Sequence, residues 1–458
     1  MRRLRCGDRR SGSVRFVPLV FVLSFLVSTI IIPLNWSSPS RAASSSGALV
    51  RVGLVREEPV ASLGARGQAI IYDSAGSLLT FFQGEETLAA GAGNTVSLPG
   101  CGVVPGPLVV RAAASGDPST PDFVTVGGHP YRGELEVFAR DGLLTVVNVI
   151  PLEDYLLGVV PREMPAGFPA EALKAQAVAA RTYALYTQAG RLYAASGYDL
   201  VPTTACQVYG GVEAESESTT AAVRATDGEV ITYNGSLIGA FFHSTSGGHT
   251  ESVEFVWGFP CPYLKGVPDS DQDSPHYAWS VAFTADDLSA RLEAAGYGVG
   301  RIYALGGVTP QGPGGRYLDS VVTGSDGEVR LRSEKLRSVL GLRSTRFAVV
   351  AERERVENVT RPLSSGSLVA INAEGAVAPI PTVALVALGA GYAYPLRSPE
   401  LWVAAPVRVP ASFILNGQGW GHGVGLSQWG ARGLALQGLD YLGILTHYYT
   451  GVTVGNLP

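Results

Sequence analysis

Charged side chains are scarce in this 458-residue sequence, and lysine is nearly missing. Only 16% of the residues are charged and 46% are apolar, which excludes a disordered chain and is typical of a globular protein. The length allows two or three domains with a sizeable buried core. Glycine and proline are abundant instead, with 57 and 29 residues that separate short apolar runs, as in folds rich in strands and turns.

Cysteine is also rare. The four cysteines form no Cys-x-x-Cys pair, which argues against a structural zinc site of the usual spacing. Cys101, Cys206 and Cys261 remain if an N-terminal signal is removed, and this number is odd. In an oxidising compartment Cys206 and Cys261 can form a disulfide, which would leave Cys101 free.

A long uncharged apolar run lies near the N-terminus. Six arginines within residues 2–15 precede the apolar residues 16–34, and small residues follow at 40–44. This order is typical of a secretory signal, although residues 16–34 are also long enough to stay as a membrane anchor. We therefore expect residues 1–43 to be a signal peptide or anchor, and the rest to be extracytoplasmic, in the cell envelope.

Positive charge is in deficit once this segment is removed. Residues 1–42 hold seven Arg and one Asp of the 34 basic and 39 acidic residues, so 27 basic and 38 acidic residues remain, a net charge of −11. A nucleic-acid partner calls for a basic face, so we expect none.

The patterns predict an α+β fold with a β-rich N-terminal domain. Over residues 48–147, apolar runs such as 49–55, 69–73 and 135–138 are typical of strands between turns. Beyond this part, from residue 148 to 451, helical and strand patterns mix. Elsewhere we expect strands and turns at 143–150 and 199–265, short helices at 284–297 and 333–341, and an insertion or extra sheet at 359–411.

One helix is predicted from Pro169 to about Gln188, with Gly190 beyond its end. It is apolar nearly all round and should be buried. Lys174 and Arg181 lie seven residues apart and share one face of it. Because buried cations need partners, they either form structural ion pairs or line a cleft and face a polar or anionic ligand.

Near the C-terminus, glycine alternates with other residues from Gly417 to Gly425. In a strand these glycines would share a face that another backbone or a ligand can approach closely. Two helices should follow, one starting near Ser427 and ending before Gly438, and one over residues 440–449.

Glu163 is the most informative single residue. It lies between Pro161 and Pro165 and next to Met164. Burial among such neighbours would raise its pKa, which a general acid working near neutral pH requires. The plain alternative is a surface glutamate in a proline-rich loop.

Several separated segments resemble the SpoIID/LytB family of peptidoglycan-acting proteins. Among them are Glu-Met-Pro at 163–165, Cys-Gln-Val-Tyr at 206–209 and Gly-Trp-Gly-His-Gly at 419–423. All occur in order between residues 148 and 451. The other matching segments are 148–160, 171–183, 243–248, 262–264, 341–345, 424–431 and 447–449.

This resemblance implies a SpoIID-like domain over residues 148–451 with a substrate cleft beside the buried helix. It implies a lytic transglycosylase that cleaves MurNAc–GlcNAc β-1,4 bonds in glycan strands without stem peptides and forms 1,6-anhydro-MurNAc ends. Glu163 would be the general acid and base, and Lys174 and Arg181 would support activity at the substrate. The further substrate-binding candidates are Gln207, Tyr209, His243, Ser246, Gly247, Gly248, Trp420, His422 and Gln428.

Some of these assignments have alternatives. His422 can be a structural histidine with satisfied hydrogen bonds, and Trp420 can fill the core instead of stacking on a sugar. Some relatives bind zinc through a His and two Cys, of which only Cys206 has a counterpart here. His243 and His249 with Cys206 are the remaining possible metal ligands. We predict neither metal nor cofactor.

A second function fits the same resemblance: a glycan-binding module that stimulates a cell-wall amidase without cleaving the glycan. The expected partners are therefore peptidoglycan glycan strands and a cell-wall amidase. Contact with the membrane is expected only through an uncleaved N-terminal segment.

Overall fold

The computed structural model describes residues 47–456, except 115–121, 309–310 and five short stretches between 363 and 401. Everything described below belongs to one compact unit within Pro39–Pro458. The predicted signal or anchor at residues 1–43 lies outside the described residues. No helix of the described part combines the length and apolarity that crossing a membrane requires.

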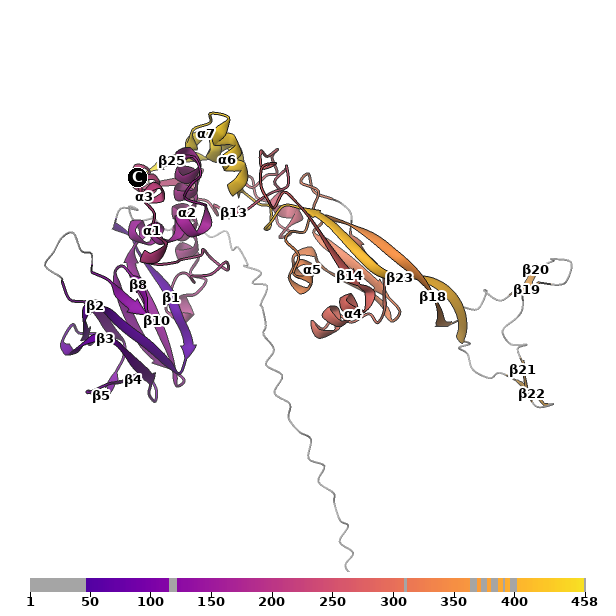
Figure 1. Cartoon of the computed structure of the whole chain (residues 1–458), viewed down its shortest axis with the longest axis horizontal. Helices are drawn as coiled ribbons and strands as arrows, with labels where there is room; N and C mark the ends of the chain where they lie inside the picture. The colour runs from indigo at the N-terminus through magenta and orange to yellow at the C-terminus, as the bar shows by residue number, and fades with distance from the viewer. Residues whose placement is uncertain are drawn as a thin grey trace, which may run out of the picture. The chain divides into compact units, whose positions relative to one another are not determined.

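The N-terminal part is a ten-stranded sheet, as the apolar runs predict (Figure 1). Its order is β1-β10-β9-β6-β2-β3-β4-β5, with β7 pairing to β2 and β8 to β7, and every pair is antiparallel. Leu135, Val137 and Ala139 are buried at alternate positions of β9, the strand periodicity that the sequence shows. The strands are β1 (Leu49–Glu58), β2 (Val60–Tyr72), β3 (Leu78–Ala90), β4 (Thr95–Leu98), β5 (Gly102–Pro105), β6 (Leu108–Ala112), β7 (Val124–Val126), β8 (His129–Tyr131), β9 (Glu134–Arg140) and β10 (Leu143–Pro151).

Three helices follow the sheet. Strand β10 leads directly into α1 (Leu152–Glu163), then come α2 (Ala170–Gly190) and α3 (Glu217–Ala225). Helix α2 confirms the prediction within two residues at either end, and Arg191 in the left-handed region closes it. The sequence patterns predict neither α1 nor α3.

Smaller sheets and four further helices complete the described part. Sheets β12-β11-β25, β14-β23-β18 and β15-β16-β17 are antiparallel, and β13 pairs with β24 in parallel. The helices predicted at 284–297 and 333–341 are confirmed as α4 and α5, and the two at the C-terminus as α6 and α7. The elements are β11 (Glu229–Tyr233), β12 (Ser236–Leu237), β13 (Phe242–His243), β14 (Ala278–Thr284), α4 (Ala285–Ala294), β15 (Ile302–Gly307), β16 (Asp319–Gly324), β17 (Gly327–Arg332), α5 (Ser333–Leu340), β18 (Phe347–Pro362), β19 (Val369–Ile371), β20 (Val377–Pro379), β21 (Val386–Gly389), β22 (Tyr392–Pro395), β23 (Trp402–Gln418), β24 (Leu426–Ser427), α6 (Gln428–Leu436), α7 (Tyr441–Tyr448), β25 (Thr453–Asn456), and short 3-10 turns at Ala194–Ser196, Val212–Ala214 and Val253–Phe255.

The predicted strand with glycines on one face is wrong. Strand β23 ends at Gln418, and Gly419, Gly421, Gly423 and Gly425 all have positive φ, from 72° to 109°. A strand needs negative φ, whereas positive φ favours glycine because it has no Cβ. The glycines therefore let the chain wind irregularly from β23 to β24.

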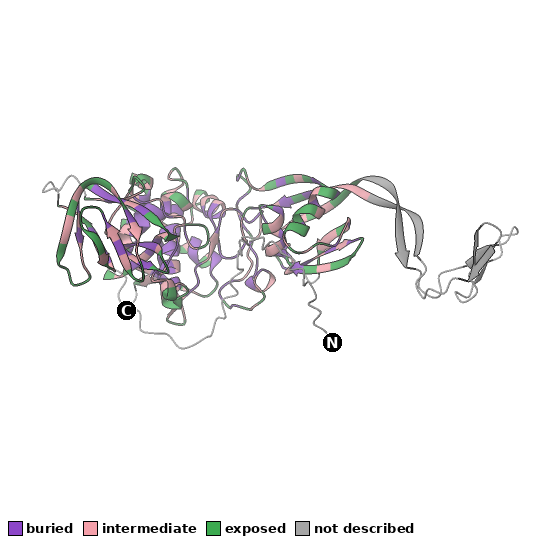
Figure 2. Cartoon of the chain, turned by 90° about the horizontal axis from the view of Figure 1, so that it is seen from below, coloured by how far each residue is buried: buried purple, intermediate pink, exposed green. Residues whose placement is uncertain are grey.

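Helix α2 lies between two buried clusters, which confirms that it is a buried helix. Figure 2 colours the chain by burial, with buried residues in purple. One cluster joins Ala175 and Ala179 to side chains of α6, α7 and β11, and the other joins Ala177 and Ala180 to α1 and β1. Alanine on both faces allows neighbouring elements to approach α2 closely. The helix thus holds α1 and α6 in fixed positions on either side.

Candidate functional site

Glu163 is the last residue of α1, and its backbone is fixed by its neighbours. Pro165 disfavours helical conformation at Met164, which is extended with φ −131° and ψ 132°, so α1 ends here. The Met164 side chain is fully buried in the cluster that contains Ala175 and Ala179. A buried anchor therefore lies directly beside a half-buried carboxylate.

Two distant segments donate hydrogen bonds to this carboxylate. The backbone N–H of Val208 lies 2.7 Å from Oε1, and Nε2 of Gln428 lies 3.4 Å from Oε2. Gln428 is the first residue of α6, whose N-cap Ser427 accepts from the backbone N–H of Gly430. The Glu-Met-Pro segment, residues 206–209 and the start of α6 thus meet at one carboxyl group.

Burial raises the pKa of Glu163, as predicted, and the hydrogen bonds from Val208 and Gln428 lower it by less. In the described part of the chain, no charged side chain shifts this pKa. The carboxyl therefore holds its proton to higher pH than an exposed glutamate, without help from a second acidic group.

Two tyrosines lie close enough to Glu163 for its charge to act on them. Burial raises the pKa of Tyr155 and of Tyr183, and the charges of Cys206 and Glu163 raise both further, so both phenols stay protonated. Tyr155 is fully buried, whereas Tyr183 keeps some exposure. Sequence reasoning did not single out Tyr183, although it closes the matching segment 171–183.

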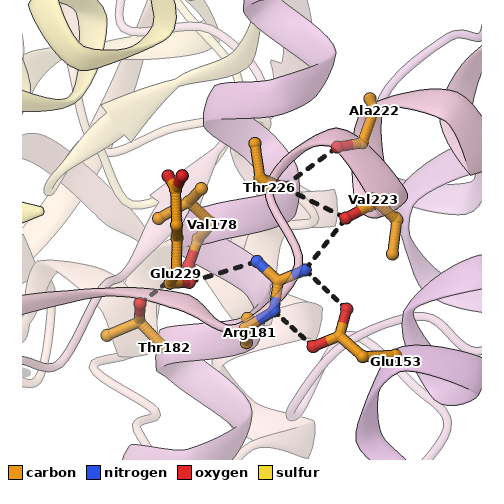
Figure 3. A network of polar contacts seen from close by, with 8 residues as sticks. All are labelled: Glu153, Val178, Arg181, Thr182, Ala222, Val223, Thr226 and Glu229. Carbon is orange, nitrogen blue, oxygen red and sulfur yellow. Dashed lines mark hydrogen bonds and ion pairs between the residues drawn. The ribbon is translucent and has the colours of Figure 1, made fainter. Parts of the chain in front are cut away.

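Arg181 is fully buried, which agrees with the structural ion pair, one of its two alternatives. Figure 3 shows the polar network around it. Its side chain has no exposed area, and Nε and Nη2 each lie 2.7 Å from a carboxylate oxygen of Glu153 on α1. Nη1 and Nη2 also donate to the carbonyls of Glu229 and Val223. Arg181 thus joins α1, α2, α3 and β11, and its support for the site is structural.

Lys174 also has a carboxylate partner. Its Nζ lies 2.7 Å from Oε1 of Glu171, and it lies over the ring of Tyr441 at 5.7 Å. The Tyr441 hydroxyl donates to Glu229, whose carbonyl accepts from Arg181. Lys174 and Arg181 thus share one side of α2, as predicted, and each forms an ion pair with a glutamate of the protein.

Gln207 and Tyr209 are interior residues as well. Gln207 has no exposed area, donates to the carbonyl of Ala180 and accepts from the Tyr155 hydroxyl. Tyr209 is 5% exposed and donates to Oδ1 of Asn148 at 3.0 Å. Their polar atoms are occupied inside the protein, and their contact with substrate stays a prediction.

The loop Ser246–Gly248 surrounds a carboxylate of the protein itself. The backbone N–H groups of Ser246, Gly247 and Gly248 and the Ser246 hydroxyl all donate to Asp271, at 2.6 to 3.0 Å. Positive φ at both glycines, 85° and 98°, turns successive N–H groups inward. These donors were predicted to face substrate, but the fully buried Asp271 takes them.

His243 and His422 bind backbone groups. Nδ1 of His243 donates to the carbonyl of Val424, and Nε2 of His422 donates to that of Phe242 while its Nδ1 accepts from Val424. Burial lowers the pKa of His243 well below its usual value and that of His422 to about 3. Both are neutral, and His422, with both ring nitrogens bonded, is a structural histidine, which was its alternative. Nε2 of His243 is buried and has no hydrogen-bond partner in the described part of the chain, so its contact with substrate stays a prediction.

Trp420 has the exposure that contact with a sugar requires. Its residue surface is 42% exposed, the Arg343 guanidinium lies 5.6 Å from its ring centroid, and the His276 ring meets it edge-on at 4.3 Å. The prediction that Trp420 fills the core is therefore wrong. Its contact with substrate stays a prediction, as does the substrate cleft itself.

The three cysteines of the described part are free, so Cys206 and Cys261 are not bridged. Over the same residues, no group of three or more His, Cys, Asp and Glu side chains is placed to hold a metal ion. His243, His249 and Cys206 are therefore not brought together as ligands.

Comparison with known proteins shows the family of this chain. The family model of SpoIID, the stage II sporulation protein, matches residues 140–233. An uncharacterized protein of Brachyspira hyodysenteriae is 31% identical over 73% of this chain and 75% of its own, and stage II sporulation protein D of Bacillus subtilis is 30% identical over 67% and 75%. An amidase enhancer of Bacillus subtilis is 32% identical over 65% of this chain and 40% of its own length. The chain belongs to the SpoIID family of stage II sporulation proteins.

Proposed function

We propose that this protein is an extracytoplasmic lytic transglycosylase that cleaves peptide-free peptidoglycan glycan strands, with Glu163 as general acid and base. One observation carries the proposal. The Glu163 carboxyl is half-buried, hydrogen-bonded by Val208 and Gln428, and has a raised pKa to which no charged neighbour in the described part contributes. A raised pKa favours the protonated form that a general acid needs at the pH at which it works.

A single carboxyl group suits a lytic transglycosylase better than a hydrolase. Hydrolysing glycosidases use two carboxyl groups, one as acid and one as base or nucleophile, about 5 to 9.5 Å apart. A charged group within about 4 to 6 Å would shift the pKa of Glu163, and none in the described part of the chain does. When the nucleophile belongs to the substrate itself, a second carboxylate is not needed, because one sugar supplies both reacting atoms.

In this reaction Glu163 first donates a proton and then takes one back. The protonated carboxyl gives its proton to the glycosidic oxygen as the bond from MurNAc C1 to GlcNAc O4 breaks, and GlcNAc leaves with a 4-hydroxyl. The resulting carboxylate then takes the proton of the MurNAc C6 hydroxyl while O6 bonds to C1. This forms the 1,6-anhydro ring, returns Glu163 to its protonated state and consumes no water.

Substitution at Glu163 tests the proposal. Wild-type protein incubated with peptide-free glycan should release anhydro-disaccharides, and Glu163→Gln should release none above background while remaining folded by circular dichroism. Gln437→Leu, on the exposed end of α6, is a matched control that should keep full activity. Equal product from Glu163→Gln and wild type would refute the role of Glu163.

The relative named amidase enhancer supports a second candidate. In that case the protein binds glycan and stimulates a separate cell-wall amidase, and Glu163 does no chemistry. Adding a purified amidase separates the two: Glu163→Gln would stimulate it as well as wild type does, and neither would form anhydro ends.

A further inference from the structure

Helix α6 presents a cation one turn beyond the residue that touches Glu163. Gln428 and Arg432 are four residues apart in α6, so their side chains emerge from one face, with Cβ atoms about 6 Å apart. Gln428 donates to Glu163 from this face. Arg432 was not among the residues selected from the sequence.

The loop after Glu163 also touches Arg432. The ring of Phe168 meets that of Trp429 edge-on at 5.0 Å, and the Arg432 guanidinium lies 5.8 Å from the first ring and 5.4 Å from the second. The loop from Glu163 to Phe168 therefore meets α6 twice, at Gln428 and at Arg432. These contacts hold the guanidinium beside the loop that follows Glu163.

Arg432 has N–H donors that can serve a ligand. In the described part its one ion pair is to Asp273, 3.2 Å from Nη1, and the side chains of the two are 28% and 74% exposed. A guanidinium carries five N–H donors in a rigid fork, so most stay available to a second acceptor. The two rings restrict its orientation, which lowers the entropy lost when a ligand binds.

The cations of α2 differ in this respect. Arg181 is fully buried and bound to Glu153, and Lys174 is paired with Glu171 against Tyr441. Arg181 cannot meet a new anion without breaking its pair, and Glu171, the partner of Lys174, is only 32% exposed against 74% for Asp273. Arg432 is a partly exposed cation whose partner is largely in water, where an ion pair is weak.

We propose that Arg432 binds the free lactyl carboxylate of a MurNAc residue and thereby selects glycan strands whose stem peptides have been removed. This rests on the proposed function, which supplies the glycan. Removing the peptide leaves the lactyl group as a carboxylate, which accepts two parallel hydrogen bonds from a guanidinium. In a peptide-bearing strand the same carbonyl belongs to a neutral amide, which can offer only one oxygen.

Chemical modification of the glycan tests the pairing. Peptide-free strands are compared with the same strands after carbodiimide coupling of the lactyl carboxylates to methylamine, and binding is measured to the full chain carrying Glu163→Gln. Methylamidation should weaken binding about tenfold, the usual scale of a charge-assisted hydrogen bond. Adding Arg432→Gln should weaken binding to carboxylate strands by the same factor and leave binding to methylamide strands unchanged.

Three further variants accompany this cycle. Arg291 on α4 has a similar setting, paired with Asp287 at 3.0 Å and lying 5.3 Å from the Phe283 ring, and Arg291→Gln should change nothing. Asp273→Asn removes the competing carboxylate and should tighten binding to carboxylate strands only. Arg432→Lys, which keeps the charge but not the fork, should fall between wild type and Arg432→Gln.

The inference would be overturned if Arg432→Gln weakened binding to both kinds of strand equally. It would also be overturned if methylamidation did not change binding, or if the protein did not bind glycan. These outcomes differ from failure of the proposed function, because binding is measured without cleavage. Carboxylate-selective binding without anhydro products would refute only the transglycosylase. Anhydro products formed equally from both kinds of strand would refute only the role of Arg432.

Discussion

The side-chain amide of Gln428 lies 3.4 Å from the carboxylate of Glu163, although 265 positions separate the two residues. The contact joins the end of α1 to the start of α6, and both helices pack against α2. The acidity of Glu163 therefore depends on α6 being in place.

Replacing Gln428 with leucine should shift the pH dependence of activity. The amide hydrogen bond lowers the pKa of Glu163, so its loss lets burial raise that pKa further. A general acid works while protonated, and the fall of kcat/KM at high pH should therefore move to higher pH. The profile on peptide-free glycan checks this, with Gln437→Leu as control, and a shift to lower pH would contradict it.

Glu163→Gln should stabilise the folded protein at neutral pH. Burial raises the folded-state pKa above its ordinary value of 4.5, so the folded state binds more protons between the two values and loses stability as pH rises through that window. A neutral glutamine has no such loss. Thermal unfolding should give a higher Tm for the variant at pH 7 and no difference well below pH 4.5.

The control for this prediction is Glu58→Gln, at an exposed position of β1, which should leave Tm unchanged at both pH values. A lower Tm for Glu163→Gln at pH 7 would mean that the charged carboxylate stabilises the fold, which is the opposite of what its raised pKa predicts. Such stabilising substitutions at functional sites are a common trade-off between stability and activity.

Arg181→Met should destabilise the fold by about 3 to 5 kcal/mol, because it leaves the Glu153 carboxylate without its buried partner and frees two backbone carbonyls. Urea unfolding measures this. Arg291→Met, which breaks an exposed pair with Asp287, should change stability by less than about 1 kcal/mol. Similar losses for the two variants would contradict the structural role of Arg181.

Asp271→Asn should cost about 2 to 3 kcal/mol, since an amide cannot accept all the hydrogen bonds that this carboxylate receives from Ser246, Gly247 and Gly248. The matched control is Asp273→Asn, two residues away and largely exposed, which should be nearly neutral in the same urea experiment. If both variants unfold at the same urea concentration as wild type, the loop does not depend on Asp271.

Local patterns predict much of the fold. Alternation in β9 and the apolar surface of α2 are properties of neighbouring residues, and both predictions are confirmed. Helix α1 has no such signal, because Pro151 directly precedes it and Pro161 lies inside its last turn, and proline favours breaks. The glycines from Gly419 to Gly425 were misread because periodicity does not reveal the sign of φ.

The site was harder to predict, since its side chains act through distant partners. The sequence singles out Glu163 and Gln428 but contains no sign that they touch. The inward orientation of Arg181 depends on Glu153, and the loop at Gly247 closes on Asp271, a residue with no motif of its own. Arg432 stood within the C-terminal region but outside the matching segments.

The most direct test of the central claim is cleavage of peptide-free glycan in water enriched with oxygen-18, followed by mass spectrometry of the products. A lytic transglycosylase that uses the MurNAc C6 hydroxyl adds no solvent oxygen, so we predict 1,6-anhydro-MurNAc ends one water lighter than the reducing sugar, without label, and dependent on Glu163. Labelled reducing ends, or no cleavage by the wild-type protein, would contradict the transglycosylase mechanism.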